Sequence, residues 1–389
     1  MENKFKIAQV STYTFALLMF FLPLWRWVEN ILLAILILCF FVERKKIINR
    51  AAILKNSLIF FAIYVAFRSL VDGQFLNDFP EIIKLLPLLL IPFGINNLTK
   101  EQLNIGLLFL FLGILVMQIG SSIGVLDYYF FSDGKKIRLS NYAKINQIIG
   151  FERPYLGFFS VINVILAYYF FTLKKQWLYL LPILMSLILI IVISARLSFI
   201  IVILILLALI LQQIKKKAII LIPLILMVFL SSIYLVFQKN SLTQRFYAIN
   251  KDARSIIWKG AIEQLNTTKN YFFGNGGQKE IRDNLLEYYK NTAVFVYPPE
   301  KDRFVRVNYN THNQFLNEFI RGGAIGLLLF MFPFLNLFYK NVINFNIISI
   351  FLLFSIFSFC FVENILERQK GIYLLALILG ITYNFYEKK

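Results

Sequence analysis

The sequence contains a single histidine, His312, which stands where a long polar segment runs back into an apolar stretch. Histidine ordinarily changes charge between about pH 5 and 8, which suits it to take a proton from a weak nucleophile. A general base at this position would act on substrates held at a membrane surface, and Asn313 beside it is a candidate for substrate binding. A histidine just before a helix can also serve only as an interfacial or capping residue, so both roles stay open.

Arginines at the edges of apolar stretches could bind phosphate, because a guanidinium group can form two parallel hydrogen bonds to it. Arg196 lies in Ser194-Ala195-Arg196-Leu197-Ser198 between two apolar runs, and a charge flanked so tightly usually has a partner or a function. Alternatively, Arg196 could simply extend from a short loop to the lipid headgroups. Arg153 and Arg303, in polar segments, are further candidates for binding substrate phosphates.

Residues 254–265 have apolar side chains at helical spacing and predict an amphipathic helix that lies along the membrane. Trp258 would lie at headgroup level, and Arg254, one turn earlier, would either face a phosphate or extend toward the headgroups. The following Gly274-Asn275-Gly276-Gly277 predicts a tight turn, because glycine tolerates positive φ and close backbone approach. Such a turn is weak evidence for phosphate binding by itself.

Two glycines follow His312 at helical spacing. Gly323 and Gly326 come eleven and fourteen residues later, about three and four helical turns. The three residues would therefore lie on one stripe of a helix, and the glycines would let a second helix approach closely and fix the position of the histidine.

The composition predicts the elements that position these residues. Hydrophobic residues make up 59% of the chain, 42 residues are Phe, and apolar runs of about twenty residues recur along nearly the whole length. The chain is therefore predicted to be an all-α polytopic membrane protein with about twelve spans. The predicted spans lie near 9–27, 29–43, 52–71, 80–98, 104–126, 154–173, 176–194, 197–213, 218–237, 314–339, 344–362 and 371–386.

Lysine and arginine in alternate short loops place the N-terminus and the C-terminus in the cytoplasm by the positive-inside rule. These basic residues are Arg44-Lys45-Lys46, Arg50, Lys174-Lys175, Lys215-Lys216-Lys217, Lys340 and Lys388-Lys389. The chain then divides into spans one to nine over 1–237, a large extracytoplasmic loop over 238–313 and spans ten to twelve over 314–389.

Two predicted outer segments, 128–153 and 238–312, are basic although they face outward. The longer one carries Arg245, Arg254, Arg282, Arg303, Arg306 and several lysines. This charge favours an anionic partner such as a diphosphate or a phosphorylated glycolipid at the outer membrane surface, although a solvated loop is also compatible with it. The net charge of +19 supports anionic ligands without identifying one.

Other classes of partner and cofactor find little support. Nucleic acid is a poor partner, because the basic residues lie in short cytoplasmic loops or on the outside. Cys39 and Cys360 both fall in apolar spans, so we expect neither a disulfide nor a zinc site in the long loop. No Asp-rich metal motif stands in the outer loops, and we expect no cofactor. A transporter usually carries ionisable residues at the middle of the membrane, where only Arg68 and Lys84 come near.

Together these features resemble the O-antigen ligase family and its related O-antigen polymerases. The ligase pattern His-[Asn/Ser/Gln]-x9-Gly-x2-[Gly/Thr/Tyr] is matched in full by His312-Asn313, followed after nine residues by Gly323 and after two more by Gly326. Ser194-Ala195-Arg196 matches the family's Ser-x-Arg element at the outer end of a span.

A third family element, Arg-x3-Trp followed by a Gly-x-Gly turn, is matched by Arg254, Trp258, Gly274 and Gly276. The matched motifs cover about 194–326, whereas the N-terminal half agrees only in being hydrophobic and helical. The resemblance implies a GT-C-like membrane fold with twelve spans and a dominant outer loop between the ninth and tenth. Ligase and polymerase share fold and motifs, and the short loops leave the polymerase open.

The resemblance further implies a metal-independent, inverting transfer of glycan from an undecaprenyl diphosphate carrier to a hydroxyl of the lipid A-core, in the periplasm at the bacterial inner membrane. His312 would be the general base, and Arg196 and Arg254 would stabilise the diphosphate leaving group. Arg153 and Arg303 would bind phosphates of carrier or acceptor. Trp258 and Asn313 would contact substrate, and the four glycines Gly274, Gly276, Gly323 and Gly326 would be structural.

Overall fold

The computed structural model describes residues 2–42, 52–96, 98–131, 142–213, 253–265, 268–292, 295 and 298–387. Within these residues the chain forms helices and no strand, as the sequence predicts. The predicted span 218–237, the 215–217 lysines and Arg245 lie outside the described residues, as do 43–51, 132–141 and 388–389.

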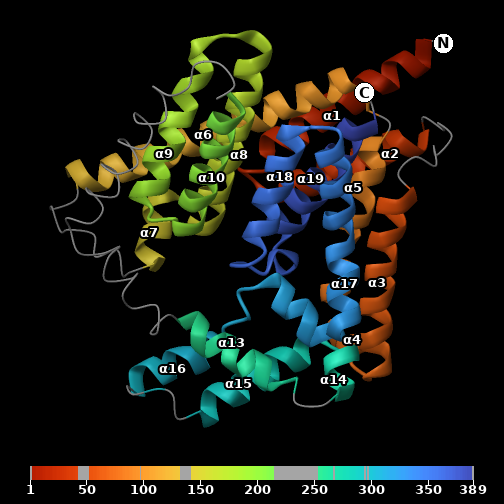
Figure 1. The fold of residues 1–389 in the computed structure, drawn as a ribbon, viewed down its shortest axis with the longest axis vertical. Helices are drawn as coiled ribbons and strands as arrows, with labels where there is room; N and C mark the ends of the chain where they lie inside the picture. The colour runs from red at the N-terminus through yellow and green to blue at the C-terminus, as the bar shows by residue number, and fades with distance from the viewer. Residues whose placement is uncertain are drawn as a thin grey trace. The chain divides into compact units, whose positions relative to one another are not determined.

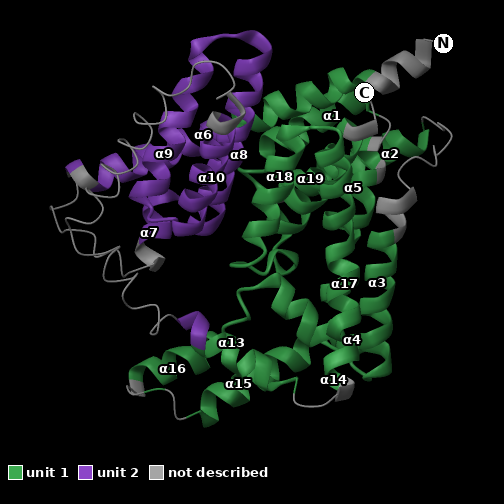
Figure 2. Cartoon of the chain, viewed as in Figure 1, with its two compact units in different colours: residues 1–113, 256–389 green, residues 114–255 purple. Residues whose placement is uncertain are grey.

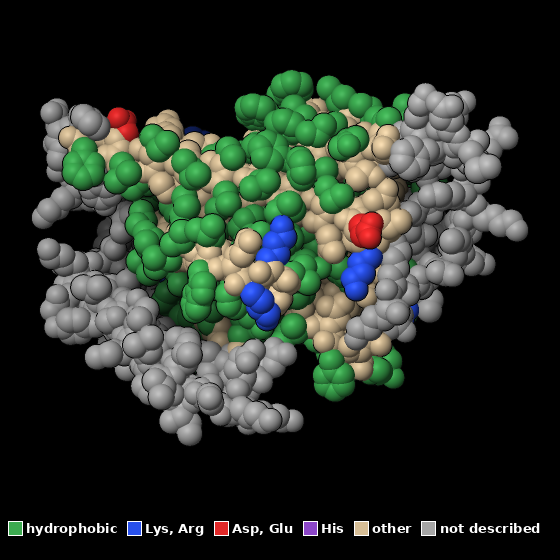
Figure 3. Space-filling view, turned by 90° about the horizontal axis from the view of Figure 1, so that it is seen from above, with side chains coloured by type: hydrophobic (Ala, Val, Ile, Leu, Met, Phe, Trp, Pro, Cys, Tyr) green, Lys and Arg blue, Asp and Glu red, His purple; other side chains and the backbone are tan. Residues whose placement is uncertain are grey.

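Three described helices are long and apolar enough to cross a membrane: Lys100–Tyr128, Arg153–Lys174 and Gln314–Ile343. Shorter apolar helices occur at Gln9–Phe21, Trp27–Val42, Ser57–Val71, Trp177–Val192, Arg196–Leu209 and Ile347–Phe359. The chain is thus multi-pass by helix length and composition, whereas the count of twelve spans stays a prediction. Figure 3 shows one face of the molecule, on which hydrophobic side chains far outnumber charged ones among the described residues.

The chain forms two compact units (Figure 2). Unit 1 comprises residues 1–113 and 256–389, and unit 2 comprises residues 114–255. The boundaries fall inside the helices α6 and α13, so each of these helices contributes to both units.

Unit 1 begins with five helices. They are α1 (Glu2–Phe21), α2 (Arg26–Val42), α3 (Ala52–Val71), α4 (Phe75–Ile83) and α5 (Leu86–Asn96), and α6 (Lys100–Phe131) follows. The predicted span 80–98 is wrong in one respect, since the helix stops after Ile83 and restarts at Leu86. Pro87 explains the break, because a proline disfavours helix in the residue before it and lacks the N–H donor for the preceding turn.

The later helices of unit 1 include four that precede α17 and lie together at one end of this unit (Figure 1). These helices are α13 (Ala253–Glu263), α14 (Thr268–Phe273), α15 (Gln278–Asn291) and α16 (Pro298–Val307). The chain then returns through α17 (Gln314–Ile343), α18 (Ile347–Phe359), the short helix η4 (Ile365–Glu367) and α19 (Gln369–Glu387). The helix predicted over 254–265 is confirmed as α13.

The long helix α17 is broken at Gly323, where φ is 62° and ψ is −161°. This conformation is open essentially to glycine alone. Three carbonyl groups before the break accept from donors outside the helix: Asn275 N–H donates to Ile320 O at 2.7 Å, Gly276 N–H to Arg321 O at 3.0 Å, and Tyr64 Oη to Gly322 O at 2.7 Å. Partners of this kind are what a break in a membrane-spanning helix would need, because lipid offers no hydrogen-bond donors.

Unit 2 contains the remainder of α6 and the helices α7 (Tyr142–Ile149), α8 (Arg153–Lys174), η2 (Trp177–Leu180), α9 (Leu181–Val192) and α10 (Arg196–Gln213). The predicted split between spans 176–194 and 197–213 is confirmed by the reversal between α9 and α10. A fully buried polar cluster joins α6, α8 and α9. In this cluster Gln118 Nε2 donates to Ser160 Oγ at 3.0 Å and to Ser186 Oγ at 2.9 Å, and Asn163 Nδ2 donates to Gln118 Oε1 at 3.0 Å.

Candidate active site

His312 lies in a short irregular segment between α16 and α17. Its backbone adopts φ 45°, and Asn308 at the start of the same segment adopts φ 47°. A left-handed backbone costs a residue with a Cβ about 1–2 kcal/mol, so the surrounding contacts must hold it. The His312 N–H donates to Asn310 Oδ1 at 3.1 Å. The side chain is 30% exposed, and its Nδ1 lies 3.7 Å from Glu363 Oε2.

The stripe predicted for His312, Gly323 and Gly326 is wrong. The helix begins only at Gln314 with Asn313 as its N-cap, and it is interrupted at Gly323, so no continuous helical face joins the three residues. Gly326 instead faces α3, where an added Cβ would lie 3.3 Å from Tyr64 Cε1.

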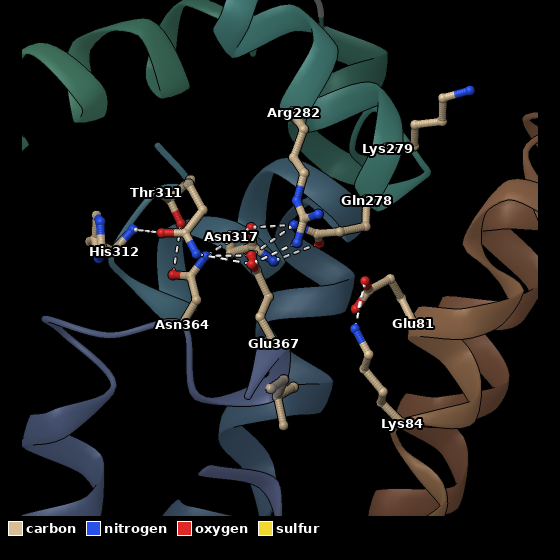
Figure 4. Close-up of polar contacts among 12 residues, drawn as sticks. Glu81, Lys84, Gln278, Lys279, Arg282, Thr311, His312, Asn317, Asn364 and Glu367 are labelled. Atoms are coloured by element: carbon tan, nitrogen blue, oxygen red, sulfur yellow. Dashed lines mark hydrogen bonds and ion pairs between the residues drawn. The ribbon is translucent and has the colours of Figure 1, made fainter. Parts of the chain in front are cut away.

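The residues on both sides of His312 are fixed by Asn364, in the segment between α18 and η4 (Figure 4). Asn364 Oδ1 accepts from Thr311 Oγ1 at 2.9 Å and from Asn313 N–H at 2.7 Å. The Thr311 carbonyl in turn accepts from Trp258 Nε1 of α13 at 2.9 Å. His312 therefore sits on a turn whose two neighbours are anchored, while its own ring reaches solvent.

Asn313 and Trp258 thus have structural contacts here. The Asn313 Oδ1 accepts from Leu316 N–H at 3.0 Å and caps α17. Trp258 holds the backbone one residue before His312. Direct contact of either residue with substrate stays a prediction.

Glu367 is the centre of the hydrogen bonds behind this turn. Its Oε1 accepts from Asn364 Nδ2 at 2.8 Å and Gln278 Nε2 at 3.1 Å, and its Oε2 accepts from Arg282 at 2.8 Å and Asn310 Nδ2 at 2.9 Å. Burial alone would raise the pKa of Glu367, but the Arg282 charge and the hydrogen bonds from Asn364, Asn310 and Arg282 outweigh it and hold the pKa below the usual value. The carboxylate is therefore ionised at neutral pH and connects helix α15 to the His312 turn.

The glycine turn Gly274–Gly277 contacts α17 and the residues Arg68 and Asp72 at the end of α3. The Gly274 carbonyl accepts from the Arg68 guanidinium at 3.2 Å, and Arg68 also pairs with Asp72 at 2.9 Å. A Cβ on Gly276 would lie 1.8 Å from Asp72 Oδ2. This turn is thus used to dock the loop on α3 and on the break in α17.

The helix α15 has no capping side chain of its own at Gly277. Asp78 of α4 supplies the cap from two hundred residues away in sequence, since its carboxylate accepts from the N–H groups of Gln278 and Lys279, both at 3.1 Å. Ser69 Oγ donates to the same carboxylate at 2.8 Å. Glu280 lies in the first turn of α15, and burial, followed by the charges of Asp72 and Asp78, raises its pKa above the usual value.

The predicted arginines are divided between the two units. Arg303 lies on α16, where it is exposed and donates through Nε to Tyr309 Oη at 3.0 Å. Arg254 lies in the first turn of α13, one turn before Trp258, and is partly exposed.

Arg196 and Arg153 belong to unit 2, and so does Arg254, because the boundary follows Ser255. Arg196 opens α10 directly after a tight reversal in which Ser194 has φ 53° and Ala195 N–H donates to Ile190 O at 3.0 Å. Arg153 opens α8, and its N–H donates to Asn146 Oδ1 of α7 at 3.0 Å.

Sequence reasoning missed the residues that support the histidine, namely Glu363, Asn364, Glu367 and Tyr309. One signal was present. The polar run Glu363-Asn364 and Glu367-Arg368-Gln369-Lys370 separates two apolar stretches on the predicted outer side, the same side as His312. Polar residues on the same predicted surface as a candidate base are candidates for its support.

Residues 180–331 match the family model described as O-antigen ligase. This range contains every motif that carries the resemblance, from Ser194 to Gly326, so the resemblance is confirmed over these residues. The match supports a membrane enzyme of the glycosyltransferase type, acting as an O-antigen ligase or polymerase. A search of the curated proteins found no match to the chain.

Proposed function

We propose that the protein is an O-antigen ligase of the bacterial inner membrane, with its active site facing the periplasm and both termini in the cytoplasm. The donor is a glycan on undecaprenyl diphosphate, and the acceptor is a sugar hydroxyl of the lipid A-core. The observation that carries the proposal is the His312 turn. Within a region that matches the O-antigen ligase model, a left-handed, partly exposed histidine is fixed through both neighbours by Asn364.

His312 acts as the general base. With Nδ1 turned toward Glu363 at 3.7 Å, Nε2 is the nitrogen that takes the proton of the acceptor hydroxyl. Hydrogen bonds of this kind are often long before the substrate binds and shorten afterwards. The hydroxyl oxygen then forms a bond to the anomeric carbon while the bond from that carbon to the diphosphate oxygen breaks. Attack from the opposite side inverts the anomeric centre, as the family implies.

Arg196 and Arg254 stabilise the undecaprenyl diphosphate as it leaves. Both stand at the first turn of a helix, Arg196 on α10 and Arg254 on α13, and a guanidinium group can bind two phosphate oxygens at once. Two such contacts supply the positive charge that other diphosphate-releasing enzymes obtain from magnesium, so transfer is proposed to be metal-independent. Arg153 is proposed to bind a phosphate of the carrier.

The central test is His312→Ala in the native host, with analysis of the surface lipopolysaccharide and of the lipid-linked pool. Loss of a general base costs about 10²–10⁴-fold in rate, or about 3–5 kcal/mol. A ligase variant leaves bare core and long polymer on the carrier. Core capped by a single repeat would identify a polymerase instead, and an unchanged ladder at equal protein level would refute the role of His312.

The arginine roles are tested by Arg196→Lys and Arg254→Lys, which keep the charge but lose bidentate binding. We expect transfer to fall by at least about tenfold in each variant, because a charge-assisted hydrogen bond contributes about 1.5–3 kcal/mol. Near-normal turnover would remove that arginine from the mechanism. Transfer that stops in a chelator and returns with magnesium would overturn the metal-independent step.

A further inference from the structure

We propose that Tyr309 and Arg303 form the acceptor subsite of this enzyme, with the tyrosine ring packing against the sugar that offers its hydroxyl to His312. Arg303 binds an anionic group carried by the same acceptor. This inference rests on the proposed function and assigns a place and a chemistry to one of its two substrates.

Tyr309 forms a fixed platform beside the histidine. Its ring centroid lies 6.0 Å from that of His312, and its ring also meets the Phe304 ring edge-on, with the centroids 5.1 Å apart. The Tyr309 carbonyl accepts from Tyr289 Oη at 3.0 Å. Phe304 and Tyr289 are buried, whereas Tyr309 is partly exposed, so a rigid base carries a ring that reaches the surface.

The position of the ring selects the acceptor over the donor sugar. A hydroxyl must come within about 2.6–3.2 Å of the base that deprotonates it, so the sugar bearing that hydroxyl lies directly beside His312. The neighbouring surface there is the ring of Tyr309, and an aromatic ring offers an apolar face suited to the C–H face of a sugar, with a polar end for hydrogen bonding. The donor's diphosphate is assigned to Arg196 and Arg254 in the proposed mechanism.

Arg303 extends the platform with positive charge. Its Nε donates to Tyr309 Oη at 3.0 Å, which fixes the plane of the guanidinium beside the ring. Its two terminal nitrogens make no hydrogen bond to the part of the chain that the structure describes, and the side chain is exposed. An exposed guanidinium group that is held through Nε alone is suited to bind a phosphate or carboxylate through its other nitrogens.

The strained backbone supports a functional role for the same segment. Both ends of 308–312 adopt positive φ at residues with side chains, Asn308 and His312, and Tyr309 lies between them. Backbone strain persists only where surrounding contacts impose it, and it is concentrated at binding and catalytic sites. The contacts from Tyr289, Asn364 and Trp258 impose this conformation, which presents the phenol ring and the imidazole side by side.

The test is steady-state transfer by the full-length protein in lipid vesicles, with lipid-linked glycan as donor and lipid A-core as acceptor. Tyr309→Ala should raise the KM for acceptor about three- to tenfold, because the loss of an aromatic contact of this kind has that effect. Arg303→Gln should raise it about tenfold. The KM for donor should stay within about twofold of wild type in both.

Two further variants separate the parts of the subsite. Tyr309→Phe keeps the ring and frees Arg303, so its acceptor KM should lie between those of wild type and Tyr309→Ala. Arg306→Gln is the matched control, because Arg306 is an exposed arginine on the same helix α16, and its acceptor KM should equal wild type. If the Tyr309→Ala protein does not fold into the membrane, the test rests on Arg303→Gln, because Arg303 is exposed and its replacement should not disturb folding.

An unchanged acceptor KM in both Tyr309→Ala and Arg303→Gln, or an equal rise for donor and acceptor, overturns the subsite. Repeating Arg303→Gln with dephosphorylated acceptor identifies the anion. A defect that disappears assigns a phosphate, and one that persists assigns a sugar carboxylate. The parallel His312→Ala reaction keeps the two proposals apart, since undiminished transfer there refutes the proposed function, whereas its loss beside unchanged KM values refutes only the subsite.

Discussion

Replacing Asp78 by alanine should loosen α15 and, through it, the His312 turn. Asp78 is 3% exposed, and its carboxylate caps α15, whose N-cap residue Gly277 has no side chain to do so. It accepts from two N–H groups at the start of α15 and from Ser69 Oγ. Loss of a helix cap costs about 1–2 kcal/mol, and the buried Ser69 bond adds about 1 kcal/mol. We therefore expect a loss of about 2–3 kcal/mol.

Hydrogen exchange measured by mass spectrometry on the protein in lipid vesicles reads this cost directly. A loss of about 2–3 kcal/mol raises the exchange rate of the α15 amides about thirty- to a hundredfold where exchange follows the opening equilibrium. Asp78→Asn keeps one acceptor oxygen but loses the charge, so its effect should be about half as large in free energy.

Glu81→Ala is the matched control on the same helix. Glu81 pairs with Lys84 at 2.8 Å, but the lysine side chain is 41% exposed, and exposed pairs contribute about 0.2–1 kcal/mol at most. Exchange in α15 should therefore stay near wild type. Equal protection of α15 in Asp78→Ala and Glu81→Ala would refute the capping argument.

Three other substitutions probe the same framework. Glu367→Gln should lower the unfolding midpoint at neutral pH and flatten its acid dependence. Because the pKa of Glu367 is lowered in the folded protein, its carboxylate stabilises the fold above the ordinary glutamate pKa of about 4.3, and this stabilisation is lost as the pH falls through the folded pKa. A variant whose unfolding midpoint depends on acid pH as wild type does would contradict this. Gly323→Ala should destabilise the protein by more than about 3 kcal/mol in a thermal melt. The added Cβ would lie 2.2 Å from the Phe272 carbonyl carbon, at backbone angles that only glycine adopts readily. Gly326→Ala is the control and should cost far less, because Gly326 is at a helical position. Trp258→Phe keeps an aromatic ring but removes the N–H donor to the Thr311 carbonyl, so kcat should fall several-fold with both KM values unchanged. A rise in KM for either substrate would instead favour the substrate contact predicted from the sequence.

The helical class, and the helices near most predicted spans, followed from the sequence because apolar length is a local property. The same holds for α13, whose apolar spacing is visible within eleven residues. The break in α17 was not predictable in this way. Gly323 stands in an apolar run that favours continuous helix, and only the donors from Asn275, Gly276 and Tyr64 make the interruption stable.

The candidate base was found from the sequence because His312 is the only histidine and lies in a recognisable pattern. The residues that hold its turn in place were not found. Asn364 and Glu367 reach the His312 turn across about fifty residues of sequence, and no spacing rule connects them. Local pattern also misplaced His312 on a helical stripe, because helical periodicity was extended over a residue that precedes the N-cap. The contacts of Asp78 and Arg68 with the Gly274–Lys279 segment were similarly not predictable, since that segment lies about two hundred residues later.

The distance in sequence between His312 and its anchors also sets the order in which the protein can become active during synthesis. Asn364 closes the turn from 53 residues beyond Thr311, and Glu367 from 57 residues beyond Asn310. A nascent chain whose α17 has just entered the membrane therefore carries the histidine without the contacts that impose its left-handed backbone. Such long-range contacts form late, after the segments that supply them have been made. We therefore expect the fixed geometry of the His312 turn only after the segment between α18 and α19 has been made, so a chain that ends before Asn364 would lack it.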